Sequence, residues 1–212
     1  MTNPVETTRR DRWSRRSWLR AALTMVFLVR SVAFAQTKSP IGSVTAVRGN
    51  AFKAVGSEHT ALDAAAPLFI KDVIGTGPDS RATLQLGTNT IIHMGADALL
   101  TIDRFLADAG GEITLQAGPI LYDHDGAAPP SGMQIRSTFG QIAVRGTRFF
   151  AGPSAGVFGV FVDRGSVTVT TAGAGVLVEA GQGTNIPHVG DTPTLPAPWK
   201  PERIRAALES VQ

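Results

Sequence analysis

Apolar and polar side chains alternate with a period of two along most of the chain between Ile41 and Ile186. Successive side chains of a β-strand point to opposite faces, so each such run places its apolar residues on one face and its polar residues on the other. The clearest runs have apolar members at Ala82, Leu84 and Leu86, at Ile113, Leu115 and Ala117, and at Val167 and Val169. A helical spacing of three or four is almost absent here, so the pattern predicts strands that bury one face.

Turn sequences rich in glycine and proline separate these runs. They include Arg48-Gly-Asn50, Gly77-Pro-Asp79, Gly110-Gly111, Pro129-Pro-Ser-Gly132, Asp163-Arg-Gly165, Gly173-Ala-Gly175 and Gly181-Gln-Gly183. A pattern G-x-[VI]-T begins at Gly42, Gly111 and Gly165, but its unequal spacings do not fit solenoid repeats of one length. Strand-length runs between such breaks are typical of all-β sandwiches, barrels and solenoids, and the residues alone leave these three open.

The C-terminal end of the chain has a different composition. Five prolines lie between positions 187 and 201 without any apolar period, so residues 187–200 are predicted as a linker or an extended wrap over the body. Residues 201–211 are predicted as a short helix, because Pro201 suits the first helical position. The apolar stripe of this helix comprises Ile204, Ala207, Leu208 and Val211. A helix this short is marginal alone, so we expect it to dock on the body or on a partner.

Residues 1–35 have the features of a cleavable export signal. Ser14-Arg-Arg-Ser-Trp-Leu-Arg20 is similar to the twin-arginine export motif, and an ordinary Sec signal with a basic start is the alternative. An apolar stretch at 21–29 follows, and Ala33-Phe-Ala35 gives the A-x-A pattern that predicts cleavage before Gln36. Spanning a bilayer takes about 20 apolar residues. We therefore expect a periplasmic protein with no stable membrane insertion after signal cleavage.

The charge of the chain is concentrated in this N-terminal segment. Of the 20 basic and 17 acidic residues, seven arginines and two acids lie in residues 1–35, which leaves 13 basic against 15 acidic residues. The basic footprint expected of a nucleic-acid-binding protein is therefore missing from the predicted mature chain. The sequence contains no cysteine, so it offers no disulfide, no thiolate ligand and no lipid-attachment site.

Two segments of the chain have a distinctive sequence. The first is Lys71-Asp-Val-Ile-Gly-Thr-Gly-Pro-Asp-Ser-Arg-Ala-Thr-Leu-Gln-Leu-Gly87, and the second is Gln141-Ile-Ala-Val-Arg-Gly-Thr-Arg-Phe-Phe150. Together they resemble the FecR domain, named for the periplasmic regulator of ferric-citrate uptake. In that family the corresponding runs are G-D-x-I-x-T-G-x-x-S-x-A-x-L-x-L and I-x-V-R-G-T-x-F. The resemblance covers about residues 41–185. The chain departs from it at Lys71, where glycine is usual, and at Gly87-Thr-Asn89, where D-G-T or D-G-S is common.

The resemblance implies a fold and a role. The implied fold is all-β, a twisted β-solenoid or jelly-roll-like stack of short antiparallel strands, here with a short C-terminal helix; the β domain would span 36–186. The implied role is that of an exported module that receives a signal from an outer-membrane transporter or serves in an envelope assembly. The first 20 residues are too short for the cytoplasmic anti-sigma helices of full FecR-type regulators, so we expect no signalling across a membrane by this chain alone.

The V-R-G-T run is interpreted as a feature of the fold. Gly146 allows a bend or bulge between Val144 and Thr147. Arg145 is predicted to bond carbonyls left unpaired at the bulge, or a carboxylate such as Asp72. The alternative is that Arg145 and Arg148 form an anion-binding pair.

Candidate chemistry elsewhere is weak, and we predict no catalytic, cofactor-binding or metal-binding residue. Gly152-Pro-Ser-Ala-Gly156 matches the G-x-S-x-G nucleophile elbow formally, but a strand-like run follows it, so Ser154 is predicted at a hairpin tip. In Asp123-His-Asp125 the three side chains of a strand cannot converge on one metal, and a solvated polar tip is the expectation. His59, His93 and His188 are isolated in the sequence. The phenylalanines are mostly expected in the core, namely Phe52, Phe69, Phe105, Phe139, Phe149, Phe150, Phe158 and Phe161.

The sequence therefore favours a non-enzymatic exported protein that acts by contact with a protein of the cell envelope, for instance by strand addition at an open sheet edge. The alternative is a periplasmic module that binds a glycan or a small molecule in a groove of the β-stack. An apolar open edge or patch would favour a protein partner, whereas a concave row of aromatic residues and carboxylates would favour a glycan. The identity of the partner does not follow from the sequence.

Overall fold

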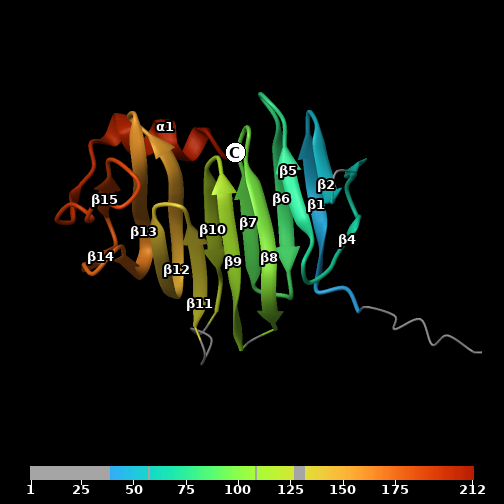
Figure 1. Cartoon of the computed structure of the whole chain (residues 1–212), viewed down its shortest axis with the longest axis horizontal. Coiled ribbons are helices and arrows are strands. Elements are labelled where there is room, and N and C mark those ends of the chain that lie inside the picture. Colours follow the sequence, from blue (N-terminus) through green and yellow to red (C-terminus); the bar gives the residue numbers. More distant parts are fainter. Residues whose placement is uncertain (1–38, 57, 108, 127–131) are drawn as a thin grey trace, which may run out of the picture. The chain divides into compact units, whose positions relative to one another are not determined.

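A computed structural model describes residues 39–56, 58–107, 109–126 and 132–212. The predicted export signal at 1–35 lies outside the described residues. The described part of the chain contains sixteen β-strands and one short α-helix, which confirms the all-β prediction (Figure 1). None of its helices has the length and apolar character that a membrane span requires.

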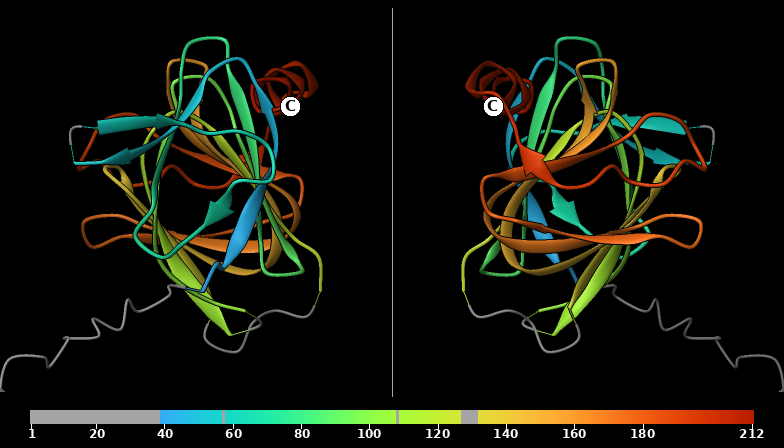
Figure 2. Two further views of the ribbon diagram at one scale, coloured as in Figure 1. Left: turned by 90° about the vertical axis from the view of Figure 1, so that its right-hand side faces the viewer. Right: turned by 90° about the vertical axis from the view of Figure 1, so that its left-hand side faces the viewer.

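The strands form one continuous sheet that curls so that two arms face each other (Figure 2). In order from its edge, the first arm contains β3 (Glu58–Ala61), β2 (Ala51–Val55), β5 (Val73–Thr76), β8 (Leu99–Leu106), β9 (Gly110–Ala117) and β11 (Met133–Ser137). The second arm contains β4 (Pro67–Leu68), β1 (Gly42–Arg48), β6 (Arg81–Leu86), β7 (Thr90–Met94) and β10 (Ile120–His124). The chain crosses repeatedly between the arms, as from β5 to β6 and from β7 to β8.

Two long strands join the arms. β12 (Gly140–Ser154) pairs with β11 through its first half and with β10 through its second half, and β13 (Val157–Thr170) pairs with β12 along most of its length. β13 then carries β14 (Gly175–Glu179) on the first arm and β15 (Gln182–Ile186) on the second, and β15 pairs with β16 (Ala197–Pro198). The stack is not made only of short antiparallel strands, because β12 and β13 have 15 and 14 residues and because β9 and β11 run parallel.

The main core lies between the arms and is formed by the inward residues of the alternating runs. Leu84 and Ile92 of the second arm belong to the same buried cluster as Ile102, Ile113 and Val167 of the first. All five are at most 1% exposed. At about 25 cal/mol per Å² of apolar surface removed from water, this cluster is the main stabilising contribution that a chain without disulfides has available.

A second, smaller core covers the outer face of the second arm. Helix α1 (Pro201–Glu209) begins with Pro201, has Glu202 in its first turn, and lies beside the strands at the top of Figure 1. The cluster contains Leu121, Phe150 and Phe161 from the sheet and Trp199, Ala207 and Val211 from the C-terminal segment, with Ile204 and Leu208 packed against it. The apolar stripe of the helix therefore docks on the body of its own chain.

Residues 187–200 lie against the body before the helix begins. The hydroxyl of Thr184 donates to the carbonyl of Thr194 at 2.7 Å, and the N–H of Thr194 donates to the carbonyl of Asn185 at 2.9 Å. β16 adds a two-residue ladder on β15, and Pro193 is buried. This segment, named the strap (residues 187–200), brings Trp199 onto the sheet.

Candidate functional site

The V-R-G-T run forms the corner at which the sheet turns from one arm to the other. Gly146 has a φ of +59°, a left-handed conformation that glycine adopts without steric cost. The pairing register between β12 and β13 shifts between Arg145 and Arg148. Val144 still pairs with Met133 in the first arm, whereas Phe149 pairs with Tyr122 in the second. The predicted bend at Gly146 is confirmed.

The predicted role of Arg145 is wrong. Its side chain is exposed, it stands opposite Ser166 of β13, and it makes no ion pair within the described residues. Asp72 directly precedes β5 in the first arm. β5 lies four strands from β12 in the sheet, a separation of about 19 Å at the usual strand spacing. Asp72 instead forms an ion pair with Lys53 and accepts the N–H of Phe69 at 2.9 Å.

Arg148 is the arginine of this run that forms ion pairs. Its Nη1 lies 3.4 Å from Asp123, and its Nε lies 3.4 Å from Asp163. Arg164 donates to Asp123 at 2.9 Å and to the carbonyl of His124 at 3.1 Å. Two carboxylates already face the Arg148 guanidinium, so it is not a free anion site. The groups are partly exposed, and such pairs contribute little to stability.

The prediction of a solvated tip at Asp123-His-Asp125 is also wrong for its first two residues. β10 continues through His124, which is 6% exposed and whose Nδ1 lies 3.0 Å from the Thr90 hydroxyl. Asp123 points to the opposite face and joins the two arginines. Only Asp125 is exposed at the end of the strand. The tripeptide therefore divides between the core and the outer face, as its strand geometry requires.

The other histidines lie apart from one another. His93 Nδ1 lies 3.2 Å from the Thr83 hydroxyl, and burial lowers the pKa of His93, with Arg148 adding to this effect and Asp123 opposing it. His59 stacks on Phe52 with ring centroids 4.5 Å apart, and His188 pairs with Asp191 at 2.9 Å. Among the residues that the structure describes, no three histidines or acids come together as metal ligands.

Ser154 lies at the tip of the β12–β13 hairpin and not on a strand-to-helix elbow. Its hydroxyl accepts a hydrogen bond from Arg203 Nε at 3.1 Å, and Arg203 Nη2 donates to its carbonyl at 3.2 Å. A hollow of about 420 Å³ separates this tip from α1, and its lining includes Glu202 but no histidine. Ser154 therefore serves as an anchor for Arg203, and among the described residues no histidine or carboxylate forms a hydrogen bond with its hydroxyl.

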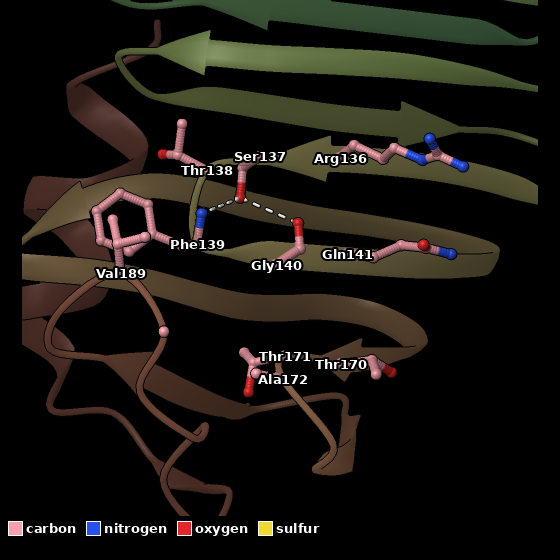
Figure 3. A pocket seen from close by; sticks show the side chains of 11 residues that line it. Arg136, Ser137, Thr138, Phe139, Gly140, Gln141, Thr170, Thr171, Ala172 and Val189 are labelled. Carbon is pink, nitrogen blue, oxygen red and sulfur yellow. Dashed lines mark hydrogen bonds between the residues drawn. The ribbon is translucent and has the colours of Figure 1, made fainter.

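A hollow of about 520 Å³ surrounds the turn between β11 and β12. The Ser137 hydroxyl holds this turn, since it accepts the N–H of Phe139 and donates to the carbonyl of Gly140, both at 3.2 Å (Figure 3). The ring of Phe139 stacks on Phe158 at 4.6 Å, with 13° between the ring planes. Because β12 bends at Gly146, the turn before its first residue and the hairpin after its last residue meet, and this stack joins the two arms.

Three adjoining hollows share Phe139 and together are named the Phe139 groove. Their volumes are about 520, 140 and 280 Å³. The largest is lined by Arg136, Ser137, Thr138, Phe139, Gly140, Gln141, Thr170, Thr171, Ala172, Val189 and Gly190. The smaller two add Leu115, Gln116, Ala117, Gly118, Pro153, Gly156, Val157, Phe158 and Pro187. The groove thus combines an apolar floor with hydroxyl and amide groups.

The polar groups of the Phe139 groove follow from the strand register. Arg136 of β11 is paired with Gln141 of β12, which is paired with Thr170 of β13, so the three form one row across the outer face of the first arm (Figure 3). Arg136 Nε lies 3.1 Å from Glu112. The hydroxyl of Thr171 is buried and has no hydrogen-bond partner among the described residues. No carboxylate or imidazole lines the three hollows, so they offer binding groups but no acid or base.

Sequence reasoning did not find this groove. Phe139 was expected in the core, and it is only half-buried, as are Phe52 and Phe69, whereas Phe105, Phe149, Phe150, Phe158 and Phe161 are buried. The one available signal was the Thr138-Phe139-Gly140 turn, which places a large apolar residue at a position where strands reverse.

Comparisons with known proteins agree with the fold. Residues 72–168 match the model of the family described as FecR protein. Two crystal structures, at 2.50 and 1.65 Å resolution, of a proposed anti-sigma factor from Parabacteroides distasonis ATCC 8503 are similar to this chain with a TM-score of 0.54 and 14% sequence identity. The similarity covers 64% of this chain and 63% and 64% of theirs, so this chain spans less than two thirds of those chains. At this identity the likeness concerns the fold.

No curated protein matches the sequence. The family match begins at Asp72 of the first motif and extends over β5 to β12 into β13, so it includes the corner at Gly146 and the Phe139 turn. The chain is therefore similar to the FecR family over residues 72–168.

Proposed function

We propose that this protein is an exported, periplasmic FecR-domain protein that works as a sensor, adaptor or envelope-assembly module by binding another protein. Three observations support this. The N-terminal sequence has the pattern of an export signal, the FecR family contains regulators, and the similar solved structures are of a protein described as a proposed anti-sigma factor. The proposed role is regulatory and non-enzymatic.

The Phe139 groove is the observation that carries a protein-binding role. A peptide segment could place an apolar side chain beside Phe139 and Val189, both of which line the largest hollow. Its main-chain groups would then find the side-chain amide of Gln141 and the hydroxyl of exposed Thr138 within the same hollow. An apolar pocket with a few convergent polar groups is the usual composition of such recognition sites.

A glycan-binding role has less support. Sugar sites usually combine an exposed aromatic face with carboxylates, and the groove has no carboxylate in its lining. Phe139 is the aromatic residue of the largest hollow, and one face of its ring is already covered by Phe158. The groove is therefore better suited to an apolar side chain than to a sugar.

The test is affinity capture from the cell envelope with the full protein tagged at Gln212, compared with two variants. Thr138→Glu places a charge at an exposed position of the groove, and Thr60→Glu is the matched control on exposed β3. The expected result is one envelope protein recovered with the wild-type protein and with Thr60→Glu but reduced at least tenfold with Thr138→Glu. Equal recovery with all three proteins would contradict a role for the groove, and recovery of no envelope protein would contradict the adaptor function.

A further inference from the structure

Each arm of the sheet has two edges, and the four edge strands differ in how well they are protected. The edges of the second arm are β4 and β16, which have two residues each and contain Pro67 and Pro198. The edge β3 of the first arm carries Glu58 and His59. Short length, proline and charge are the usual devices that prevent an edge from pairing with another chain. These three edges are therefore protected.

The fourth edge, β14, has none of these protections along its apolar centre. Its five residues read Gly-Val-Leu-Val-Glu, and β13 is the one strand it pairs with among the described residues. Leu177 at its centre is 56% exposed on the outer face, whereas Val178 is fully buried. An edge strand with a Val-Leu-Val centre, no proline or lysine, and its one charge at its last residue is a template for strand pairing.

The hydrogen-bond pattern shows which groups of β14 are available. The N–H of Thr171 donates to the carbonyl of Ala174 at 2.9 Å at the start of the β13–β14 ladder. Bonded and non-bonded pairs alternate along an antiparallel ladder, so the next bonded pairs are Val169 with Val176 and Val167 with Val178. Leu177 lies between them. Its N–H and C=O therefore point away from β13, toward the open edge.

We propose that β14 pairs antiparallel with β14 of a second copy of this chain, with a two-fold axis at Leu177. This register places Leu177 opposite Leu177 of the second copy, which covers the most exposed apolar side chain of the strand. Val176 stands opposite Val178, and Gly175 stands opposite Glu179, so no like charges face each other. The hydrogen-bonded pairs between the two copies are Leu177 with Leu177 and Gly175 with Glu179, whose backbone N–H and C=O groups point away from β13. The strand is therefore complementary to itself, and the first arms of two copies form one continuous sheet.

The pairing extends the cross-strand row that begins in the Phe139 groove. Arg136, Gln141, Thr170 and Gly175 lie in one cross-strand row. In the proposed register, Glu179 of the second copy continues this row one strand beyond Gly175. The dimer thus supplies a carboxylate at the end of the groove row, where the described residues of a single copy place none. The dimer rests on the β14 edge and stands independently of the proposed function.

Cysteine substitution tests the register directly, since the chain has no native cysteine. Bonded antiparallel pairs have Cα atoms about 5.5 Å apart, which is within the range of disulfides. Under mild oxidation, Leu177→Cys is expected to give a covalent dimer on a non-reducing gel. Leu106→Cys, a control with an exposed fraction of 58% at the end of β8, is expected to remain largely monomeric. Equal crosslinking of both variants would overturn the proposal.

Light scattering of the full, unmodified chain across a concentration series provides the second measurement. The average mass of the wild-type protein is expected to rise twofold with concentration. Leu177→Lys is expected to abolish this rise, because it places two ammonium groups beside each other on the two-fold axis. Leu106→Lys is expected to retain the rise. A wild-type protein that stays monomeric, or a dimer that survives Leu177→Lys with unchanged circular dichroism, would refute the pairing. Failure here is distinguishable from failure of the proposed function, because capture through Thr138 does not depend on Leu177.

Discussion

Trp199 is expected to hold the strap and helix α1 on the second arm. Its side chain is 8% exposed, its ring lies 5.4 Å from the ring of Phe161, and the guanidinium of Arg203 lies 3.5 Å from its centroid. Arg203 in turn donates to Ser154 and, at 2.7 Å, to Asn185. Replacing Trp199 by alanine removes the central side chain of the smaller core and the ring over which the Arg203 guanidinium lies.

The size of the effect follows from two opposing contributions. Removing a buried tryptophan typically costs about 3–5 kcal/mol. The indole nitrogen of Trp199 is buried without a hydrogen-bond partner among the described residues, and losing such a group returns about 1–3 kcal/mol. Taking the middle of each range, the expected net loss is about 2 kcal/mol, and at about 2–4 °C per kcal/mol for a domain of this size the melting temperature should fall by about 4–8 °C. Trp199→Phe keeps a ring and removes the unpaired N–H, so its loss should stay below about 1 kcal/mol.

Thermal melts followed by far-ultraviolet circular dichroism measure these losses, and Gly159 provides a double-mutant cycle. A β-carbon at Gly159 would lie 2.6 Å from the Trp199 ring and 3.0 Å from Arg203, so Gly159→Ala should destabilise the wild-type protein. In the Trp199→Ala background the same change should cost clearly less, because the ring is gone. The reasoning is refuted if Trp199→Ala melts within about 1 °C of wild type, if Trp199→Phe loses as much as Trp199→Ala, or if the two changes are additive.

Three further predictions concern single positions in the body. Gly146→Ala places a side chain at a φ of +59° and should cost about 1–2 kcal/mol in urea unfolding. Ala143→Gly, the reverse exchange inside the same strand, should cost about 0.5–1 kcal/mol and serves as the comparison. Lys71 has a φ of +72° where the family has glycine, so Lys71→Gly should raise the unfolding free energy by up to about 1 kcal/mol despite the loss of its exposed contact with Asp103; a lower urea midpoint would contradict this. Folding lowers the pKa of His93, so the unfolded chain binds a proton at a higher pH than the folded chain does. The unfolding free energy should therefore fall as the pH drops below the ordinary histidine pKa of 6.5. His93→Gln should flatten this dependence between pH 7 and 5, roughly the range in which an ordinary or lowered histidine pKa titrates.

Much of the fold follows from local pattern. The alternation at Leu84, Ile113 and Val167 correctly identified the inward faces, because the side-chain period of a strand does not depend on which strand is its neighbour. The corner at Gly146 could be predicted for the same reason, since a bend needs a residue that tolerates positive φ. Lys71 was correctly marked as a departure, and its positive φ shows why glycine is usual there.

The sequence did not reveal which residues become neighbours across adjacent strands. Arg145 and Asp72 resembled partners, but strand order separates them, while Arg148 and Asp123 come together because β10 and β12 are adjacent. Phe139 and Phe158 lie 19 positions apart and stack only because a bent strand returns on itself. Likewise, nothing in Gly-Val-Leu-Val-Glu reveals whether β14 is central or at an edge. Each of these features depends on topology, which local patterns do not encode.

The attachment of the C-terminal segment has a mechanical consequence. A pulling force applied at Gln212 would load α1 first and then the two-residue ladder of β16, both far weaker than the twelve paired positions between β12 and β13. Elements with few contacts open first, so the segment would peel away while the sheet stays intact. Lifting α1 and Trp199 would uncover Leu121, Phe150 and Phe161, an apolar face that is buried in the folded protein. The same docking that stabilises the resting protein therefore makes its outer surface sensitive to tension.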